Sequence, residues 1–532
     1  MSNENLYALL RREYMTRPDD VCVEVVEPEQ RGLEYSFRAI DAGSGMLANF
    51  FASLGLKKGA RIVVHAEKSA EVLMVYLAAL RGGWVFVPLN NAYRDELAHF
   101  FADSDPSVVI TSTENHKWVR GLAERAGVPH VFTLDNGSGT LLSLAVECSL
   151  VHEAVQTSAD DLAVIIYTSG TTGVSKGAML SHRNLISNAL TLRDHWGFPR
   201  AGQPARDVLI HALPIYHVHG LFVACHLALL SGSRMLWLQK FDPEVVIKLF
   251  RRATVFMGVP TMYGRLLSSS SLTPNACSAM RLFVSGSAPL LPQTHQAFTQ
   301  RTEHEIVERY GMSETGMITS NPYHFTSDST GRQPGTVGSA LPGVEIRVRD
   351  ESGVICQVGG VGEVEVKGPN VCAGYWRMSE RSAEAFTADG WFRTGDVGSI
   401  DERGLLTLVG RRKDLIISGG LNIYPGEIEA VINDMPGVEE SAVVGAPHAD
   451  FGECVVAVVV VRPGASLAAN DVSFHVKQRL ASFKTPKIVA IVDALPRNAM
   501  GKVQKALLRK QFSAAFQMPV EGSNTKGVDY VT

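Results

Sequence analysis

Hydrophobic and polar positions follow two different periodicities along this chain. Up to residue 340, short apolar runs rich in β-branched residues alternate with stretches whose apolar residues recur three and four positions apart. These are the spacings of a buried strand and of an amphipathic helix. Residues 241–260 show both, because Asp242 can cap a helix, Val246 and Leu249 fall on one helical face, and the apolar run 254–260 follows. Strands and helices that alternate in this way predict parallel sheets flanked by helices.

From residue 340 to residue 410 the pattern changes to period two, in the segments GVEIRVRD, GEVEVKGP and GLLTLVG. Alternation of this kind between glycine-rich turns predicts an antiparallel β subdomain. After the segment GRRKD a smaller unit begins, in which helical spacing at 424–432 and at 471–480 flanks the apolar run VVAVVVV. We therefore predict an α/β protein with a large N-terminal domain, residues 1–412, and a small α+β C-terminal domain, residues 413–532.

Composition and charge narrow the class of protein. A chain of 532 residues is too long for one hydrophobic core. The formal net charge of −4 gives no electrostatic reason to expect a nucleic acid partner. No window approaches the ~18 uninterrupted apolar residues of a membrane span, so we expect no membrane partner. The seven scattered cysteines form no C-x-x-C pair, which disfavours a cysteine zinc site and favours a reducing compartment. The expected location is the cytoplasm, and the sequence leaves the mitochondrial matrix open.

The segment YTSGTTGVSKGAML, residues 167–180, carries the first candidate chemistry. It follows the predicted strand LAVIIY, and ligands of α/β sheets gather at loops beyond strand ends. Its donors, and glycines that let backbone amides approach an anion, are those of a phosphate-holding loop. The residues concerned are Thr168, Ser169, Gly170, Thr171, Thr172, Gly173 and Lys176. The loop differs from the P-loop pattern G-x-x-x-x-G-K-[ST], because Ser175 stands at the second glycine and Gly177 at the magnesium-binding hydroxyl.

Further motifs follow in order, namely SGSAPL at 285–290, ERYGMSET at 308–315, WFRTGD at 391–396, GRRKDLIISGGLNIYPGEIE at 410–429 and PRNAMGKVQK at 496–505. Together with the loop, they resemble the adenylate-forming enzymes, which include acyl-CoA synthetases, luciferases and the adenylation domains of peptide synthetases. The resemblance covers nearly the whole chain. It implies that the loop holds the β- and γ-phosphates of ATP while a carboxylate attacks the α-phosphate and pyrophosphate leaves.

The resemblance also implies roles for single residues at the nucleotide. Tyr310 would stack on adenine, Glu314 would hold Mg²⁺, and Asp396 would accept hydrogen bonds from two ribose hydroxyls. Arg411 is expected near the ribose and the phosphates, with a catalytic role. The remaining nucleotide-binding residues would be Gly286, Ser287, Ala288, Arg309, Gly311, Met312 and Ser313. Position 313 departs from the family, which usually has threonine there, but the hydroxyl is retained.

Catalysis and domain motion are implied for the C-terminal part of the chain. Lys502 would bridge the substrate carboxylate and the α-phosphate, two anions that repel each other until a cation joins them. Lys413 matches the hinge of the family, about which the small domain swings after the adenylate forms. The same motion would bring the segment SGGLNIYPG to the site, where Gly419 and Gly420 let the pantetheine arm of the co-substrate CoA pass close to the backbone.

The acid substrate is suggested by a charged residue in an unexpected position. Arg265 lies on the predicted helix after a buried strand, where a fatty acid would need a large apolar side chain, and arginine binds carboxylates bidentately. This segment, with LPIYHVHGL, RLFVSGSAPL and ERYGMSET, looks most like the malonate–CoA ligases of the family. That resemblance implies that Arg265 and Ser287 bind the distal carboxylate and that His217 lines the acyl pocket. His211, His217 and His219 have no carboxylate or cysteine in suitable spacing, so we expect buried histidines and no metal site.

The main hypothesis is a ligase that converts malonate and ATP to malonyl-AMP and pyrophosphate, and then malonyl-AMP and CoA to malonyl-CoA and AMP. Methylmalonate is a second candidate, because one extra methyl group is a weak basis for rejection. The alternative is an acyl-CoA synthetase for another short-chain or aromatic acid. A peptide-synthetase module is disfavoured because the chain ends soon after Lys502, and a non-catalytic nucleotide-binding protein because Lys502 and Glu314 are both present. Oligomeric state stays open.

Overall fold

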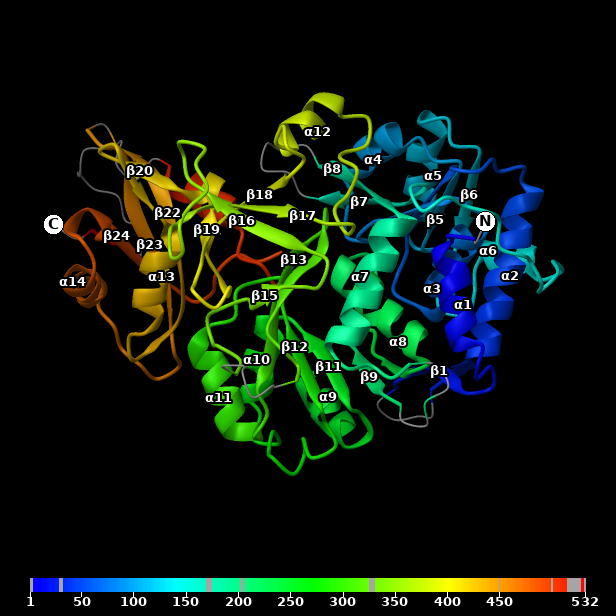
Figure 1. Cartoon of the computed structure of the whole chain (residues 1–532), viewed down its shortest axis with the longest axis horizontal. Coiled ribbons are helices and arrows are strands. Elements are labelled where there is room, and N and C mark those ends of the chain that lie inside the picture. Colours follow the sequence, from blue (N-terminus) through cyan, green and yellow to red (C-terminus); the bar gives the residue numbers. More distant parts are fainter. Residues whose placement is uncertain are drawn as a thin grey trace. The chain divides into compact units, whose positions relative to one another are not determined.

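The computed structural model in Figure 1 describes residues 3–27, 32–168, 175–200, 203, 206–324, 331–448, 450–498, 501–513 and the backbone of 528–530. The chain splits into two compact units. The first consists of Met1–Ile346 and Val366–Phe392, and the second of Arg347–Glu365 and Arg393–Thr532. Residues 412 and 413 both belong to the second unit, and a domain boundary between them stays a prediction.

The first unit contains a large sheet with the strand order β15-β14-β13-β12-β11-β9-β10-β1-β2. Its centre, from β1 through β10, β9, β11 and β12 to β13, is parallel, whereas β2, β14 and β15 join antiparallel. Because the central strands are parallel, the loops that follow them meet at one edge of the sheet, where α/β proteins bind ligands. The strands are β1 Val21–Val25, β2 Glu34–Ser36, β9 Val208–His211, β10 Arg234–Trp237, β11 Val255–Gly258, β12 Leu282–Ser285, β13 Ile306–Met312, β14 Gly316–Ser320 and β15 Ser339–Ala340.

A second sheet of the same unit has the order β6-β5-β3-β4-β7-β8. Its strands pair in parallel except for β7 and β8, which form an antiparallel hairpin. The strands are β3 Arg61–His65, β4 Val85–Pro88, β5 Val108–Thr111, β6 His130–Thr133, β7 Leu162–Thr168 and β8 Lys176–Ser181.

Helices cover these sheets with their apolar faces. In α9 (Pro243–Leu249) the Asp242 side chain accepts a hydrogen bond from the Val245 N–H at 3.0 Å, so the predicted cap is confirmed. Helices α9, α10 (Pro260–Leu267) and α11 (Pro292–Thr302) lie beside β11 and β12 (Figure 1). Buried rings such as those of Tyr263 and Phe283 belong to the core that these elements share. The helices of this unit are α1 Leu6–Tyr14, α2 Phe37–Ser53, α3 Ala70–Arg81, α4 Leu97–Ser104, α5 His116–Arg125, α6 Thr140–Ala145, α7 His182–His195, η1 His219–Cys225, α8 His226–Ser231, α9, η2 Phe250–Arg252, α10 Pro260–Leu267, α11 Pro292–Thr302 and α12 Ser379–Ala385.

The second unit contains an antiparallel sheet of order β16-β17-β18-β19 and a larger sheet of order β21-β20-β23-β24-β25, with β22 paired to β23. The elements are β16 Glu345–Arg349, β17 Gly362–Lys367, β18 Phe392–Ile400, β19 Leu406–Arg411, η3 Arg412–Asp414, β20 Ile416–Ser418, β21 Leu421–Ile423, α13 Pro425–Asn433, β22 Val438–His448, β23 Gly452–Val461, α14 Ala469–Arg479, η4 Ser482–Lys484, β24 Ile488–Val492, α15 Lys505–Phe512 and β25 Val528–Tyr530.

Strand β23 explains the uninterrupted apolar run in this unit. Its side chains alternate between two cores, with Val455 and Val459 facing helices α13 and α14, and Val456 and Val458 facing α15. A strand buried on both faces needs apolar residues at every position. The predicted α/β fold class, with its parallel sheets, antiparallel subdomain and small α+β part, is confirmed. Among the described residues, no helix is both long enough and apolar enough to span a bilayer.

Candidate functional site

The predicted phosphate loop joins two antiparallel strands. Strand β7 ends at Thr168, β8 begins at Lys176, and these two residues are paired across the hairpin. A P-loop instead opens a helix after its strand, so the hairpin is a physical reason why this segment departs from that motif. Five of the predicted phosphate-binding residues lie outside the described part of the chain, namely Ser169, Gly170, Thr171, Thr172 and Gly173.

Tyr375 lies between the two charged residues that the sequence predicts at the triphosphate. The Lys176 Nζ lies 4.8 Å from the centroid of the Tyr375 ring. The Tyr375 hydroxyl donates to the Glu314 Oε1 at 3.1 Å, and the Cys372 N–H donates to the Glu314 carbonyl oxygen at 2.7 Å. The carboxylate of Glu314 is buried, as is Tyr375, and burial together with the negative charge of Glu314 raises the pKa of Tyr375. The phenol therefore stays a neutral hydrogen-bond donor.

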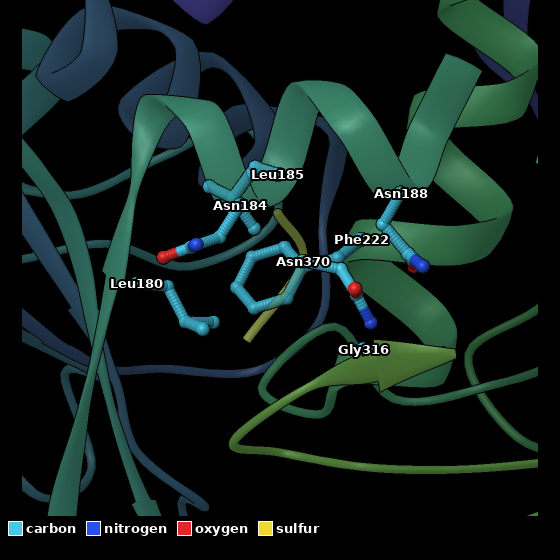
Figure 2. Close-up of a pocket in the computed structure, with 7 residues that line it drawn as sticks. All are labelled: Leu180, Asn184, Leu185, Asn188, Phe222, Gly316 and Asn370. Carbon is cyan, nitrogen blue, oxygen red and sulfur yellow. The ribbon is translucent and has the colours of Figure 1, made fainter. Parts of the chain in front are cut away.

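Three asparagine side chains fix the backbone around Glu314. The Asn188 amide donates to the Met317 carbonyl at 2.9 Å and accepts from the Met317 N–H at 3.1 Å. Asn370 donates to the Thr315 carbonyl, and Asn184 donates to two carbonyls of the 369–371 segment. Figure 2 shows these amides around a small pocket beside α7, whose other lining residues are Leu180, Leu185, Phe222 and Gly316. We interpret the pocket as part of the support of the Glu314 turn.

Gly316 shows why this turn tolerates no side chain. Its φ of +60° is left-handed, and a Cβ there would lie 2.7 Å from the Asn188 Oδ1. Tyr310, Gly311 and Met312 lie on β13, immediately before the turn that contains Ser313 and Glu314. The tyrosine predicted to stack on adenine is therefore fixed in the sheet beside the predicted magnesium ligand.

A buried polar cluster lies where the loop after β12 meets β13. Arg309 is only 3% exposed, and its Nε and Nη2 atoms have no hydrogen-bond partner among the described residues. Its guanidinium lies so close to Gly286 that a Cβ there would be 2.5 Å from the Arg309 Cζ. Ser287 has a left-handed φ of +72°, and its Oγ lies 3.5 Å from the Nδ1 of buried His219. Ala288 follows in the same loop.

Burial dominates the electrostatics of this cluster. It lowers the pKa of Arg309 to about 9, and burial together with the charge of Arg309 lowers the pKa of His219. Glu308, the neighbour of Arg309 on β13, accepts from the Leu290 N–H at 3.2 Å, and burial raises its pKa to about 8. This region thus combines a neutral imidazole, a neutral carboxyl and a desolvated guanidinium with two unused nitrogen donors.

Arg265 and His217 occupy less enclosed positions. Arg265 is exposed in the last turn of α10, and its guanidinium lies 4.9 Å from the centroid of the Phe241 ring. Arg265 therefore lies off the buried face of α10, which Tyr263 and Leu266 form. His217 is half-buried, and its Nδ1 accepts from the His219 N–H at 3.3 Å. In the part of the chain that the structure describes, no three His, Cys, Asp or Glu side chains could hold a metal ion together.

The second unit brings the predicted catalytic and ribose-binding residues together. Asp396 on β18 and Arg411 on β19 are paired across the sheet, and the Arg411 Nε lies 2.8 Å from the buried Asp396 Oδ1. Lys502 is half-buried in a turn in which its N–H donates to the Asn498 Oδ1 at 3.0 Å. Burial, with Arg411 as the next cause, lowers the pKa of Lys502 to about 8, and the charge of Asp396 opposes this shift. Lys502 is thus a partly desolvated cation close to other charged groups.

The predicted hinge and CoA residues lie on exposed turns of the same unit. Lys413 is in η3, directly after β19, and the neighbouring Asp414 accepts from the Arg509 Nη2 at 3.0 Å. Gly419 and Gly420 connect β20 and β21 with φ of +57° and +77°. Both are left-handed positions of a two-residue hairpin turn, which itself requires glycine. Their proposed proximity to pantetheine stays a prediction.

Two features of the site were not assigned from the sequence. Tyr375 was missed, because its neighbours Lys176 and Glu314 are far away along the chain. For Arg309, whose assignment to the nucleotide stays a prediction, the sequence did not indicate that its guanidinium is buried beside Gly286 with unused donors. The sequence does hold an indication for Arg309, because the charged pair Glu308 and Arg309 interrupts the otherwise apolar start of the strand IVERYGM.

Comparisons with known proteins match two family models and several enzymes to this chain. The family model described as AMP-binding enzyme matches residues 10–376, and the model described as AMP-binding enzyme C-terminal domain matches residues 427–502. A malonate–CoA ligase of Arabidopsis thaliana is 35% identical over 86% of this chain and 79% of that protein. A long-chain-fatty-acid–CoA ligase of Yersinia pestis is 33% identical over 90% of each. The crystal structure of ATP-bound MatB from Rhodopseudomonas palustris is 48% identical, with a TM-score of 0.92 over 97% of this chain and 100% of that one.

Proposed function

We propose that this chain, which belongs to the family of AMP-binding enzymes and is an AMP-forming acid–CoA ligase, uses malonate as its acid substrate. In the first step a malonate carboxylate oxygen attacks the α-phosphorus of ATP, and pyrophosphate leaves with the electrons of the broken P–O bond. In the second step the CoA thiol loses its proton and attacks the acyl carbon, and AMP leaves. Methylmalonate is the second substrate that this proposal includes.

The residues of the chain have separate tasks in the first step. Lys502 neutralises the repulsion between the attacking carboxylate and the α-phosphate, a task suited to a partly desolvated cation. Asp396 accepts the ribose hydroxyls and Arg411 lies next to it, while Lys176 binds the terminal phosphates. Mg²⁺ would be held by the buried oxygen donors of Glu314, shared with phosphate oxygens and water, and would neutralise the triphosphate. Tyr310 stacks on the adenine.

The observation that carries malonate is the buried guanidinium of Arg309. Two of its nitrogens have no partner among the described residues, in a cluster with Ser287 and His219. A buried cation with unused donors is costly unless an anion binds to it. The second carboxylate of malonate supplies that anion, and a fatty or aromatic acid does not. We therefore assign the distal carboxylate to Arg309 with Ser287, and Arg265 is the alternative cation.

Two variants separate these cations. We expect Arg309→Met to lower kcat/KM for malonate at least about 100-fold, as expected when one partner of a buried charge pair is removed. It should retain or increase activity with butyrate, which lacks the second carboxylate. Arg265→Met removes an exposed arginine from the same unit and should change kcat/KM for malonate less than about threefold. Equal losses for malonate and butyrate in Arg309→Met would contradict the assignment, and a selective loss in Arg265→Met would transfer it to Arg265.

A further inference from the structure

Tyr375 contacts both charged side chains that would face the triphosphate. Its ring lies under the Lys176 ammonium at 4.8 Å, and its hydroxyl donates to the Glu314 carboxylate at 3.1 Å. Tyr375 is 8% exposed, so both contacts are sheltered from water. Lys176 forms no ion pair with any residue in the described part of the chain.

The backbone around Tyr375 is fastened to the same two segments. The Trp376 N–H donates to the Gly177 carbonyl at 2.8 Å, and the Met179 N–H donates to the Gly374 carbonyl at 3.0 Å, which ties the segment 372–376 to β8. At its other end, the Cys372 N–H donates to the Glu314 carbonyl. The Tyr375 N–H itself donates to the Ser382 Oγ at 2.8 Å. The ring therefore has a fixed position relative to the phosphate hairpin and to the Glu314 turn.

An ammonium and a carboxylate held near one site attract each other. If they formed a direct ion pair, neither charge would be available for its own ligand, because Lys176 must bind phosphate oxygens and Glu314 must bind Mg²⁺. An aromatic face attracts a cation without taking up its hydrogen bonds. A phenol that donates to one carboxylate oxygen leaves the other lone pairs of that carboxylate in place.

We propose that Tyr375 is a positioning residue that keeps Lys176 and Glu314 apart and oriented toward Mg·ATP. Its ring holds the lysine and its hydroxyl holds the glutamate, so one side chain sets the spacing of the two charges. The inference rests on the proposed function only in that this chain binds Mg·ATP, and it is independent of which acid is activated.

The two halves of the side chain can be removed separately. Tyr375→Phe keeps the ring and removes the hydroxyl, and we expect the free Mg²⁺ that gives half-maximal pyrophosphate exchange to rise about 10-fold, the value of one charge-assisted hydrogen bond. Tyr375→Leu also removes the ring, and the dissociation constant for Mg·ATP should then rise a further ~3- to 30-fold because Lys176 loses its cation–π partner. Equilibrium titration of Mg·ATP without acid gives this constant independently of turnover.

A matched control and a double variant separate positioning from folding. Tyr35 also donates to a buried carboxylate, that of Glu71, at 2.7 Å, so Tyr35→Phe deletes the same kind of bond elsewhere and should leave the Mg²⁺ requirement unchanged. In a Glu314→Gln background, Tyr375→Phe should change Mg·ATP affinity less, because the Tyr375 hydroxyl then donates to a neutral amide oxygen instead of a carboxylate.

The proposal is overturned if Tyr375→Phe binds Mg·ATP and responds to free Mg²⁺ within twofold of the wild type. It is also overturned if the effect of Tyr375→Phe persists undiminished in Glu314→Gln. Failure of malonate as substrate leaves the equilibrium titration of Mg·ATP readable, because that titration needs no acid, so it would refute the proposed acid and not the role of Tyr375. If Tyr375→Leu does not fold, Tyr375→Phe alone tests the role of the hydroxyl. An unchanged dissociation constant for Mg·ATP in Tyr375→Phe then refutes that role.

Discussion

Replacing Arg309 with methionine should make the ligand-free protein more stable while it removes malonate use. The guanidinium is 3% exposed, and two of its nitrogens have no partner among the described residues. Methionine has a similar unbranched stem and no donors to satisfy, and it lacks the guanidinium that lies against Gly286. Under the proposed function the arginine is retained for binding, at a cost to the stability of the free state.

The size of this effect follows from the two unused donors. A buried donor without a partner costs about 1–3 kcal/mol, so the wild-type cluster carries a penalty of about 2–6 kcal/mol. Burial lowers the pKa of Arg309 to about 9, a shift that likewise reflects a cost of burying the cation. Local relaxation recovers part of the penalty, and we expect a net gain of about 1–3 kcal/mol in the free energy of unfolding. By the scaling for domains of 150–250 residues, Tm rises by roughly 2–12 °C.

Thermal unfolding of both proteins, with and without malonate, measures this. At 100 times its dissociation constant, malonate should stabilise the wild type by about 2.7 kcal/mol and should leave Arg309→Met unchanged. Arg265→Met is the control, because an exposed arginine that only stacks on Phe241 contributes little. A lower Tm for Arg309→Met than for the wild type, together with retained stabilisation by malonate, would refute the reasoning that Arg309 is an unpaired cation reserved for an anion.

Two pH effects follow from the remaining shifted groups. The pKa of Lys502 is about 8, and only its protonated form bridges two anions. The kcat/KM for pyrophosphate exchange should therefore fall above pH 8. The residual activity of Lys502→Arg should show no such fall, and pH–rate profiles of both proteins test this. Lys68 is buried, donates to the carbonyls of His211 and Leu238 at 2.7 Å, and lies 4.4 Å from the centroid of the Trp237 ring. Burial lowers its pKa from 10.5 to about 7, so the unfolded state binds more protons between these values and stability should rise with pH across that window. Urea unfolding at pH 7 and pH 9 should show a smaller rise for Lys68→Met, and equal rises would contradict the burial of Lys68.

The sequence predicted the fold class and the order of the motifs because both depend on local patterns. Strand and helix periodicity predicts the alternation of elements, and the uninterrupted apolar segment predicts that β23 is buried. The cap at Asp242 is equally local. These features need no knowledge of which distant segments meet.

The exposure of Arg265 and the contacts of Arg309 and Tyr375 were not predicted from the sequence. The sequence placed Arg265 correctly on a helix after a buried strand, but the buried face of α10 is formed by Tyr263 and Leu266, three positions apart. Arg265 lies outside that stripe and is exposed, as helical periodicity indicates, and its assignment to the distal carboxylate stays a prediction. The roles of Arg309 and Tyr375 depend on contacts between segments far apart in sequence, and no local pattern contains them.

The central claim is tested most directly by mass spectrometry of the products formed from ATP, Mg²⁺, CoA and equimolar malonate, methylmalonate, acetate, hexanoate and benzoate. The account predicts malonyl-CoA as the dominant thioester, methylmalonyl-CoA as the second, and AMP as the nucleotide product. A dominant thioester of acetate, hexanoate or benzoate would contradict the assignment of malonate while it left the acid–CoA ligase chemistry intact.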